Sequence, residues 1–374
     1  MADTLPPLAQ RMACIDASGI RKVFDLAAKL KDPINLSIGQ PDYDVPEACK
    51  ERAIAAIRAG HNRYTVTQGD QVLREAIAAD LAREFGSFNA PLLVTSGTSG
   101  GLLLAFLATL NPGDEVLVPD PYFVMYKHLL NLLGIKPVFV DTYPDFRLRA
   151  DRLEAAVTER TRMIILNTPA NPTGTVASAE EVAAAVGVAK RHNLLVIADE
   201  IYNAFSFDGP APSPWPLYDR VLLLRGFSKT YAMTGWRLGY ATGPANVIQA
   251  MTTLQQYTFV CAPAPFQLAA VTALETDMSA EIAEFRARRN LIFEGLAERF
   301  HVQRPGGAFY IFPQAPGGSG TKFVAKAIEN GLLIIPGNVF SERDTHFRIA
   351  YAAGQDTIRR GLDVLNRLAR EMGA

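Results

Sequence analysis

The chain has 374 residues, of which 49% are hydrophobic and 20% are charged, so it should be globular, with two domains or one large domain and an appendage. Its formal net charge is −1 and its longest apolar stretch is short, so we expect neither nucleic acid nor a membrane as a partner. Only three cysteines occur, without a C-x-x-C pair, which argues against a disulfide scaffold and predicts a cytoplasmic location.

Helical patterns come first along the chain. Residues 11–30 show a loosely helical pattern, and residues 46–59 and 72–85 repeat apolar side chains at helical spacing, with Gly86 placed to end the last of these helices. Short apolar runs then alternate with further helical patterns. The runs predicted to be strands are 92–95, 115–118, 136–140, 163–166, 194–198 and 221–224. Because they lack a polar face, they predict a parallel sheet covered on both sides, in an α/β fold.

The pattern changes after about residue 251. A long helical stretch is predicted over 266–296 and a final helix over 356–372. We therefore expect a large α/β domain at residues 45–276. A smaller α+β domain would be assembled from residues 1–44 and 277–374.

Polar side chains follow strand after strand of the predicted sheet. In open parallel sheets, ligands bind beyond the carboxyl ends of the strands, so these loops predict a ligand site. The segments are Ser96-Gly-Thr98-Ser99-Gly-Gly101, Asn167-Thr-Pro-Ala-Asn171-Pro-Thr-Gly174, Asp199-Glu-Ile-Tyr202 and Arg225-Gly-Phe-Ser228-Lys229-Thr230.

Each group has a functional and a structural interpretation. The loop at 96–101 can bind phosphate at a helix N-terminus, or it can be a tight turn. Asp199 can face a protonated pyridine nitrogen, or it can cap a helix or form a salt bridge. Lys229 can form a Schiff base, which partial desolvation after a buried strand favours, or it can be a solvated surface charge, for which that position is poor. Arg237 can bind phosphate through two hydrogen bonds, or it can form a surface ion pair.

Together, segments from nearly the whole chain resemble the class I/II aminotransferases of pyridoxal phosphate (PLP) fold type I. The matching segments are Gly39-Gln-Pro-Asp42, Asn62-Arg-Tyr64 with Gly69 and Leu73-Arg-Glu-Ala76, Asn111-Pro-Gly-Asp-Glu-Val116, Pro121-Tyr-Phe123, Asn167 to Gly174, Asp199 to Tyr202, Ser228-Lys229, Met233-Thr-Gly-Trp-Arg237-Leu-Gly239 and Phe347-Arg348-Ile-Ala-Tyr351. The resemblance implies a large domain with a mostly parallel seven-stranded sheet. It also implies transfer of an amino group between an L-amino acid and a 2-oxo acid, by way of pyridoxamine phosphate.

The resemblance also assigns roles by position. Lys229 would form the Schiff base with PLP and move the proton, and Asp199 would keep the pyridine nitrogen protonated. The remaining cofactor contacts would be Asn171 and Tyr202 at the phenolic oxygen, Phe123 stacked on the ring, and Thr98, Ser99, Ser228 and Arg237 at the phosphate. Arg348 would bind the substrate carboxylate, with Gly39 and Asn171 assisting.

Tyr64 resembles a tyrosine that reaches the phosphate of the neighbouring subunit, which implies a homodimer with shared active sites. Aspartate-specific members of the family carry a lysine where this chain has Ser99. A dicarboxylic substrate is therefore not supported by that route. A broader or neutral amino donor and a cation supplied from elsewhere both stay open.

Several alternatives remain at this stage. Phe123 and Tyr64 can serve packing, Asn171 a turn and Arg348 a strand salt bridge. Residues 226–230 come within one residue of the G-x-S-x-G motif of α/β-hydrolases, but the second glycine is missing. The five histidines show no metal-ligand spacing, so no metal is predicted. The serious rival is another reaction on the same cofactor, such as C–S β-elimination by a β-lyase.

Overall fold

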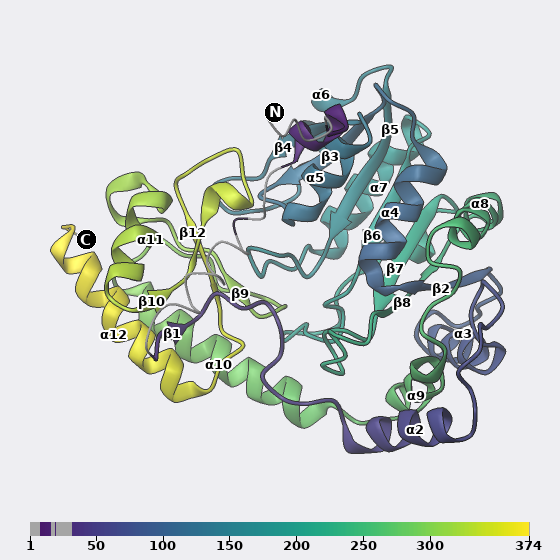
Figure 1. Cartoon of the computed structure of the whole chain (residues 1–374). Helices are drawn as coiled ribbons and strands as arrows, with labels where there is room; N and C mark the ends of the chain where they lie inside the picture. Colours follow the sequence, from purple (N-terminus) through teal and green to yellow (C-terminus); the bar gives the residue numbers. More distant parts are fainter. Residues whose placement is uncertain (1–7, 16–18, 20–31, 374) are drawn as a thin grey trace, which may run out of the picture.

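The computed structural model describes residues 8–15, 19 and 32–373. Within them, a seven-stranded sheet forms the centre of the larger region of the fold (Figure 1). The strands are β2 Leu92–Ser96, β3 Glu115–Asp120, β4 Lys136–Asp141, β5 Thr161–Asn167, β6 Leu195–Asp199, β7 Val221–Gly226 and β8 Leu238–Thr242. Their order is β2-β8-β7-β6-β5-β3-β4, and only β8 is antiparallel to its neighbours. The predicted α/β class and mostly parallel sheet are confirmed.

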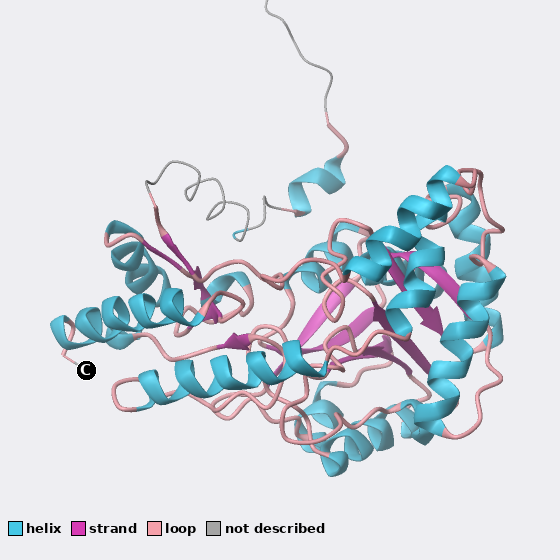
Figure 2. Cartoon of the chain, turned by 90° about the horizontal axis from the view of Figure 1, so that it is seen from below, coloured by secondary structure: helices cyan, strands magenta, loops and turns pink. Residues whose placement is uncertain are grey.

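Helices cover both faces of this sheet, as the ribbons in Figure 2 show. The helices of this region are α2 Glu47–Arg58, which packs on α9, and α3 Gln71–Phe85, α4 Gly97–Thr109, α5 Val124–Leu132, α6 Ala150–Ala156, α7 Ala179–Arg191, α8 Ala245–Tyr257 and α9 Ala264–Leu274. Successive strand residues point to opposite sides, so Ile164 packs in the cluster with α3, α7 and α9, whereas Ile165 packs in the cluster with α4, α5 and α8. This double burial explains the apolar runs of the sequence.

Two features differ from the sequence prediction. Strand β8 was not predicted, because Leu-Gly-Tyr-Ala-Thr is short and two of its five residues are poor strand formers. The helical stretch predicted over 266–296 is two helices, α9 and α10 (Ser279–Ala297), and the prediction of a continuous helix was wrong. Between them, the Asp277 side chain accepts the backbone N–H of Ser279 at 2.9 Å, a local hydrogen bond that competes with helix continuation.

A second apolar core lies beside the large sheet, on the left in Figure 1. Its elements are α10, α11 Gly320–Glu329, α12 Gln355–Glu371, β1 Ile34–Asn35, β9 Tyr310–Ile311, β10 Leu332–Leu333, β11 Ile335–Pro336 and β12 Phe347–Ala350. Strand β1 pairs with β10, and β11, β12 and β9 form an antiparallel sheet. Residues from both ends of the chain thus share one core, while the boundaries at 45 and 277 stay a prediction.

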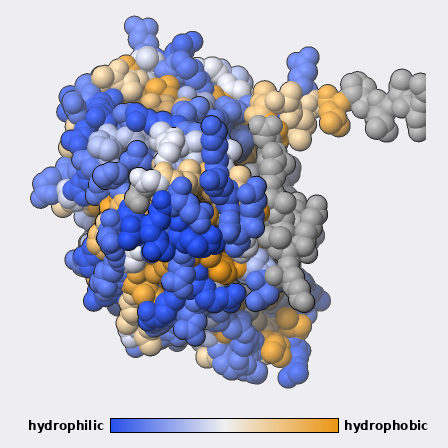
Figure 3. Space-filling view, turned by 90° about the vertical axis from the view of Figure 1, so that its left-hand side faces the viewer, coloured by the Kyte–Doolittle hydropathy of each residue, from blue (hydrophilic) through white to orange (hydrophobic). Residues whose placement is uncertain are grey.

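The outer surface of this second region is mainly hydrophilic (Figure 3). On α12, Ile358, Leu365 and Leu368 are buried, and the charged residues between them face outward. None of the described helices combines the length and apolarity that a membrane crossing requires. The helical pattern predicted for 11–30 lies mostly outside the described residues, of which Gln10–Cys14 form a 3₁₀ turn, η1.

Candidate active site

A cavity with an empty volume of about 970 Å³ opens where β5, β6 and β7 end, at the edge of the sheet where the sequence predicts a ligand site. Eleven of the predicted site residues line it: Gly39, Thr98, Ser99, Phe123, Asn171, Asp199, Tyr202, Ser228, Lys229, Arg237 and Arg348. Other lining residues, to which the sequence assigned no individual role, are Ile38, Gln40, Asn167, Ile201, Thr234 and Tyr310. The fold therefore gathers segments that are far apart in the sequence.

Lys229 lies at the mouth of β7, three residues after the strand ends. Its Nζ donates a hydrogen bond to the carbonyl oxygen of Gly39 at 2.7 Å. Burial, together with the nearby cations Arg348 and Arg237, lowers the pKa of this amine to about 8, although Asp199 partly offsets them. A lysine in this state is substantially neutral at mildly alkaline pH, as a nucleophilic amine requires.

Asp199 ends β6 and is buried at the floor of the cavity. Its Oδ2 accepts a hydrogen bond of 2.6 Å from the phenol of Tyr126, which belongs to α5. Burial raises the pKa of Asp199, while Tyr126 and, to a smaller degree, Lys229 lower it. A buried carboxylate held by a neutral phenol still favours a cation beside it. Tyr126 was not predicted as a site residue, although it follows Phe123, the predicted ring-stacking residue, by only three positions.

The opposite end of the cavity suits an anion. Helix α4 begins at Gly97, its N-cap residue Ser96 makes no side-chain cap hydrogen bond, and Thr98 and Ser99 of its first turn line the cavity. The backbone N–H groups of such an uncapped first turn are suited to bind an anion. Gly97 has a φ of +67°, and a Cβ there would lie 2.6 Å from Nη2 of Arg237. Arg237 itself has a φ of +57°, a strained conformation for a non-glycine residue that is common at functional sites.

Arg348 is a fully buried arginine whose hydrogen-bond acceptors are both neutral. Its Nη1 donates to Oδ1 of Asn171 at 3.0 Å and its Nη2 to the carbonyl oxygen of Ser37 at 2.9 Å. The guanidinium lies between the rings of Tyr310 and Phe340, and its Nε has no partner among the described residues. A buried cation with spare N–H groups favours an incoming carboxylate.

Two tyrosines, Tyr202 and Tyr310, line the cavity beside Lys229 and Arg348. The hydroxyls of Tyr202 and Tyr310 lie 2.9 Å apart, and the Tyr202 ring lies 5.9 Å from the Lys229 ammonium. Both phenols are buried, which raises their pKa values. They are therefore protonated donors at neutral pH.

Tyr64 is the one predicted site residue that does not line this cavity. Its side chain is 81% exposed and borders a shallow surface hollow with His61, Arg63 and Arg74. The structure of a single chain thus leaves its predicted role at the neighbouring subunit untested.

The sheet, its helices and a lysine at the mouth of β7 define an α/β enzyme of fold type I. The family model described as aminotransferase class I and II matches residues 31–365. A probable aspartate aminotransferase of Methanocaldococcus jannaschii is 35% identical, over 96% of this chain and 99% of its own length. An aromatic-amino-acid aminotransferase of Thermococcus litoralis is 36% identical, over 97% and 98%.

A solved structure, the aspartate aminotransferase from Thermus thermophilus with maleate, superposes with a TM-score of 0.92 at 33% identity, covering 97% of this chain and 100% of that one. The chain belongs to the class I and II aminotransferase family. It is an aminotransferase, of a family that uses PLP.

Proposed function

We propose that this chain binds PLP in the cavity at the ends of β5, β6 and β7. The observation that carries the proposal is the convergence of Lys229, Asp199 and Arg348 on that one cavity. The residues fit the group: Gly97 leaves room for the Arg237 guanidinium at the anion end, and Asp199 is a buried carboxylate in need of a cation. When bound, PLP supplies an aldehyde and a conjugated ring that takes up an electron pair.

The protein side chains divide the remaining tasks. Lys229 would hold the cofactor through its amine and, once released, would accept the α-proton of the substrate at Nζ. Asp199 would hold the pyridine nitrogen in its protonated form, and Arg348 with Asn171 would bind the α-carboxylate. The pKa of about 8 for Lys229 supports its role as a base.

The other predicted residues would complete the cofactor site. Their roles follow the family resemblance: Phe123 would pack on the ring, and Tyr202 and Asn171 would donate to its phenolic oxygen. The phosphate would be held by Thr98, Ser99, Ser228 and Arg237, with the backbone N–H groups of α4 adding to them.

The donor should not depend on a distal carboxylate. Among the described residues, the cations that line the cavity are Lys229, Arg237 and Arg348, and each is assigned to the cofactor or the α-carboxylate. Ser99 adds no charge. We therefore expect neutral or aromatic amino acids to be used at least as well as aspartate.

A donor screen tests this proposal. The purified enzyme loaded with PLP would be mixed with single amino acids, and pyridoxamine phosphate would be measured by absorbance and chromatography. Formation with neutral donors, reversed by 2-oxoglutarate or pyruvate, is the expected result. Release of pyruvate and ammonia from cystathionine, without pyridoxamine phosphate from any donor, would instead identify a β-lyase.

The active sites would be shared in a homodimer. Apolar surface is exposed at four residues, Tyr64, Tyr257, Phe259 and Val260. Phe259 lies against Gly100 in α4, so this surface adjoins the anion end of the cavity. A second copy of the chain would cover it and bring its own Tyr64 to the phosphate. The three cysteines are free thiols, which supports a cytoplasmic location.

Coexpression of a Tyr64→Ala chain with a Lys229→Ala chain tests the sharing. If Tyr64 acts across the interface, each mixed dimer has one intact and one doubly defective site. Random pairing should then restore about a quarter of wild-type activity. Activity no higher than that of the two separate variants would contradict a shared site.

A further inference from the structure

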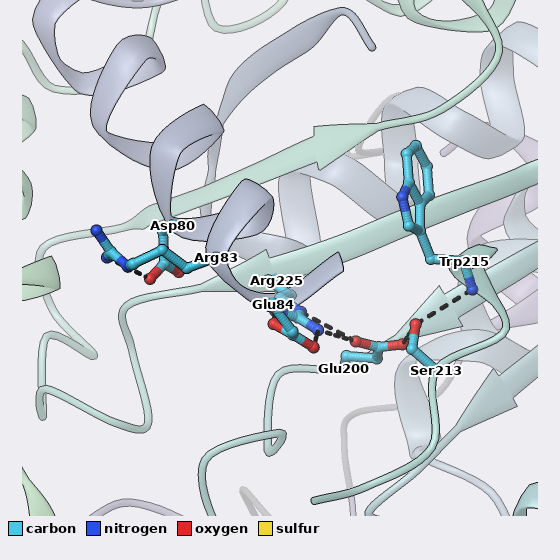
Figure 4. A network of polar contacts seen from close by, with 7 residues as sticks. All are labelled: Asp80, Arg83, Glu84, Glu200, Ser213, Trp215 and Arg225. Carbon is cyan, nitrogen blue, oxygen red and sulfur yellow. Dashed lines mark hydrogen bonds and ion pairs between the residues drawn. The ribbon is translucent and has the colours of Figure 1, made fainter. Parts of the chain in front are cut away.

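A buried charge network lies directly behind the cavity and centres on Arg225, in β7. The guanidinium donates to Oε2 of Glu200 from Nε at 2.9 Å and from Nη2 at 2.7 Å. It also donates to both carboxylate oxygens of Glu84, on α3, and stacks 5.4 Å from the ring of Phe85. Figure 4 shows Arg225 between the two glutamates. Arg225 and Glu200 are almost fully buried, whereas Glu84 is 41% exposed.

The sheet register connects this network to the proposed active site. Asp199 pairs with Leu224, and the N–H of Glu200 donates to the carbonyl oxygen of Leu224, so the ladder continues one residue past β6. Neighbouring residues of an extended chain point to opposite faces. Asp199 accordingly reaches Tyr126 and the cavity, while Glu200 reaches Arg225 on the side of α3.

Glu200 is also held by a hydrogen bond on the side away from Arg225. The second oxygen of Glu200 accepts a hydrogen bond of 2.6 Å from Ser213, whose Oγ in turn accepts the backbone N–H of Trp215. Ser213 and Trp215 lie in the proline-dense segment at residues 210–216. Buried polar networks with satisfied partners are rigid, and loss of one member leaves a costly unpaired charge.

Arg225 is also close in sequence to Lys229. It is the last residue of β7 with a side chain, because Gly226 ends the strand. A Cβ at Gly226 would lie 3.1 Å from the carbonyl oxygen of Leu238, so the turn toward Lys229 is closely packed on β8. A shift of Arg225 would therefore be passed on to the lysine.

We propose that Arg225 is a positioning residue: by clamping Glu200 against the end of β7, it fixes the placement of Asp199 relative to Lys229. The inference rests on the proposed function, because the cofactor is what these two side chains would hold at its opposite sides. A displacement of about 1 Å at such a site can cost about 100-fold in rate. The network does not touch the cavity, so its effect would act through the backbone.

Two conservative variants test the proposal in the PLP-loaded enzyme. Arg225→Lys keeps the charge but loses the planar fork, and Glu200→Gln keeps the shape but loses the charge. We expect kcat to fall about tenfold and KM to change less than about threefold. The midpoint of the pH titration of the visible absorbance, measured without substrate, should move by about 0.5 unit or more.

Asp208→Asn is the matched control. It removes the carboxylate that pairs with Arg289, another buried arginine, at 3.1 Å in the second core. This variant should lower the melting temperature while leaving kcat and the titration midpoint as in the wild type. If the network variants behave like Asp208→Asn, Arg225 has only a structural role and the proposal is overturned.

If Arg225→Lys does not fold, Glu200→Gln decides, because its amide can still accept from Arg225 and fill the same space. If the wild-type enzyme takes up no PLP, both the proposed function and this inference are refuted. If the wild-type enzyme binds PLP and shows a visible absorbance band that is the same in the variants, only this inference is refuted.

Discussion

Tyr126 donates its phenolic hydrogen to Oδ2 of Asp199 over 2.6 Å, and both side chains are buried. The contact joins α5 to the end of β6. Tyr126 does not line the cavity, but Asp199 does. Because the hydrogen bond from Tyr126 lowers the pKa of Asp199, Tyr126 belongs to the candidate active site.

Tyr126→Phe should weaken the site without unfolding it. The Tyr126 hydroxyl lowers the pKa of Asp199, so its loss leaves the carboxylate less ionised and less able to hold a protonated ring. We expect kcat to fall about 10- to 100-fold, since a hydrogen bond to a charged group contributes about 1.5–3 kcal/mol. Steady-state kinetics and the dissociation constant for PLP measure this. Tyr122→Phe, which loses a hydrogen bond to Glu342 instead, is the control and should stay within about twofold of wild type.

Lys229 should destabilise the cofactor-free protein at neutral pH. Its pKa is about 8 in the folded chain, against an ordinary value of 10.5, so the unfolded chain binds more protons between these values. Stability from this group therefore rises with pH across that window. We expect Lys229→Met to stabilise the apoprotein by up to about 3 kcal/mol below pH 8 and by less as the pH approaches 10.5. Urea unfolding at several pH values measures the difference, and a constant difference would contradict the prediction.

His346 should make the fold sensitive to acid. The imidazole packs among Tyr143, Phe146 and Phe312, and burial lowers its pKa from 6.5 to about 4. The neutral form is favoured in the folded state, so its stabilisation is full above pH 6.5 and is lost as the pH falls toward 4. The melting temperature of wild type should therefore drop more steeply over this window than that of His346→Phe. Equal slopes would show that His346 does not carry the effect.

Arg348→Lys should impair substrate binding and spare the cofactor. A lysine lacks the planar fork of arginine, so it cannot bind Asn171, Ser37 and a carboxylate at the same time. It also cannot stack between the rings of Tyr310 and Phe340. We expect KM for both the amino donor and the oxo acid to rise about 10- to 100-fold. The absorbance spectrum without substrate should match wild type. A change in the spectrum with an unaltered KM would reassign Arg348 to the cofactor.

The sequence alone determined six of the seven strands of the large sheet and most of the cavity wall, because both depend on local patterns. Apolar runs such as 163–166 and 194–198 predict strands covered on both faces, and β5 and β6 are such strands. Eleven of the twelve predicted site residues line the cavity, since strand ends in a parallel sheet meet at one edge. The family resemblance rested on the same residues.

Contacts between distant segments were decided only by the tertiary structure. Tyr126 meets Asp199 from 73 residues away, and Glu84 meets Arg225 from 141 residues away, distances over which sequence periodicity carries no information. The antiparallel β8 and the break between α9 and α10 also depend on packing and on single side-chain hydrogen bonds. The sequence thus determined which groups could do the chemistry, while the fold decided which neighbours set their charge and position.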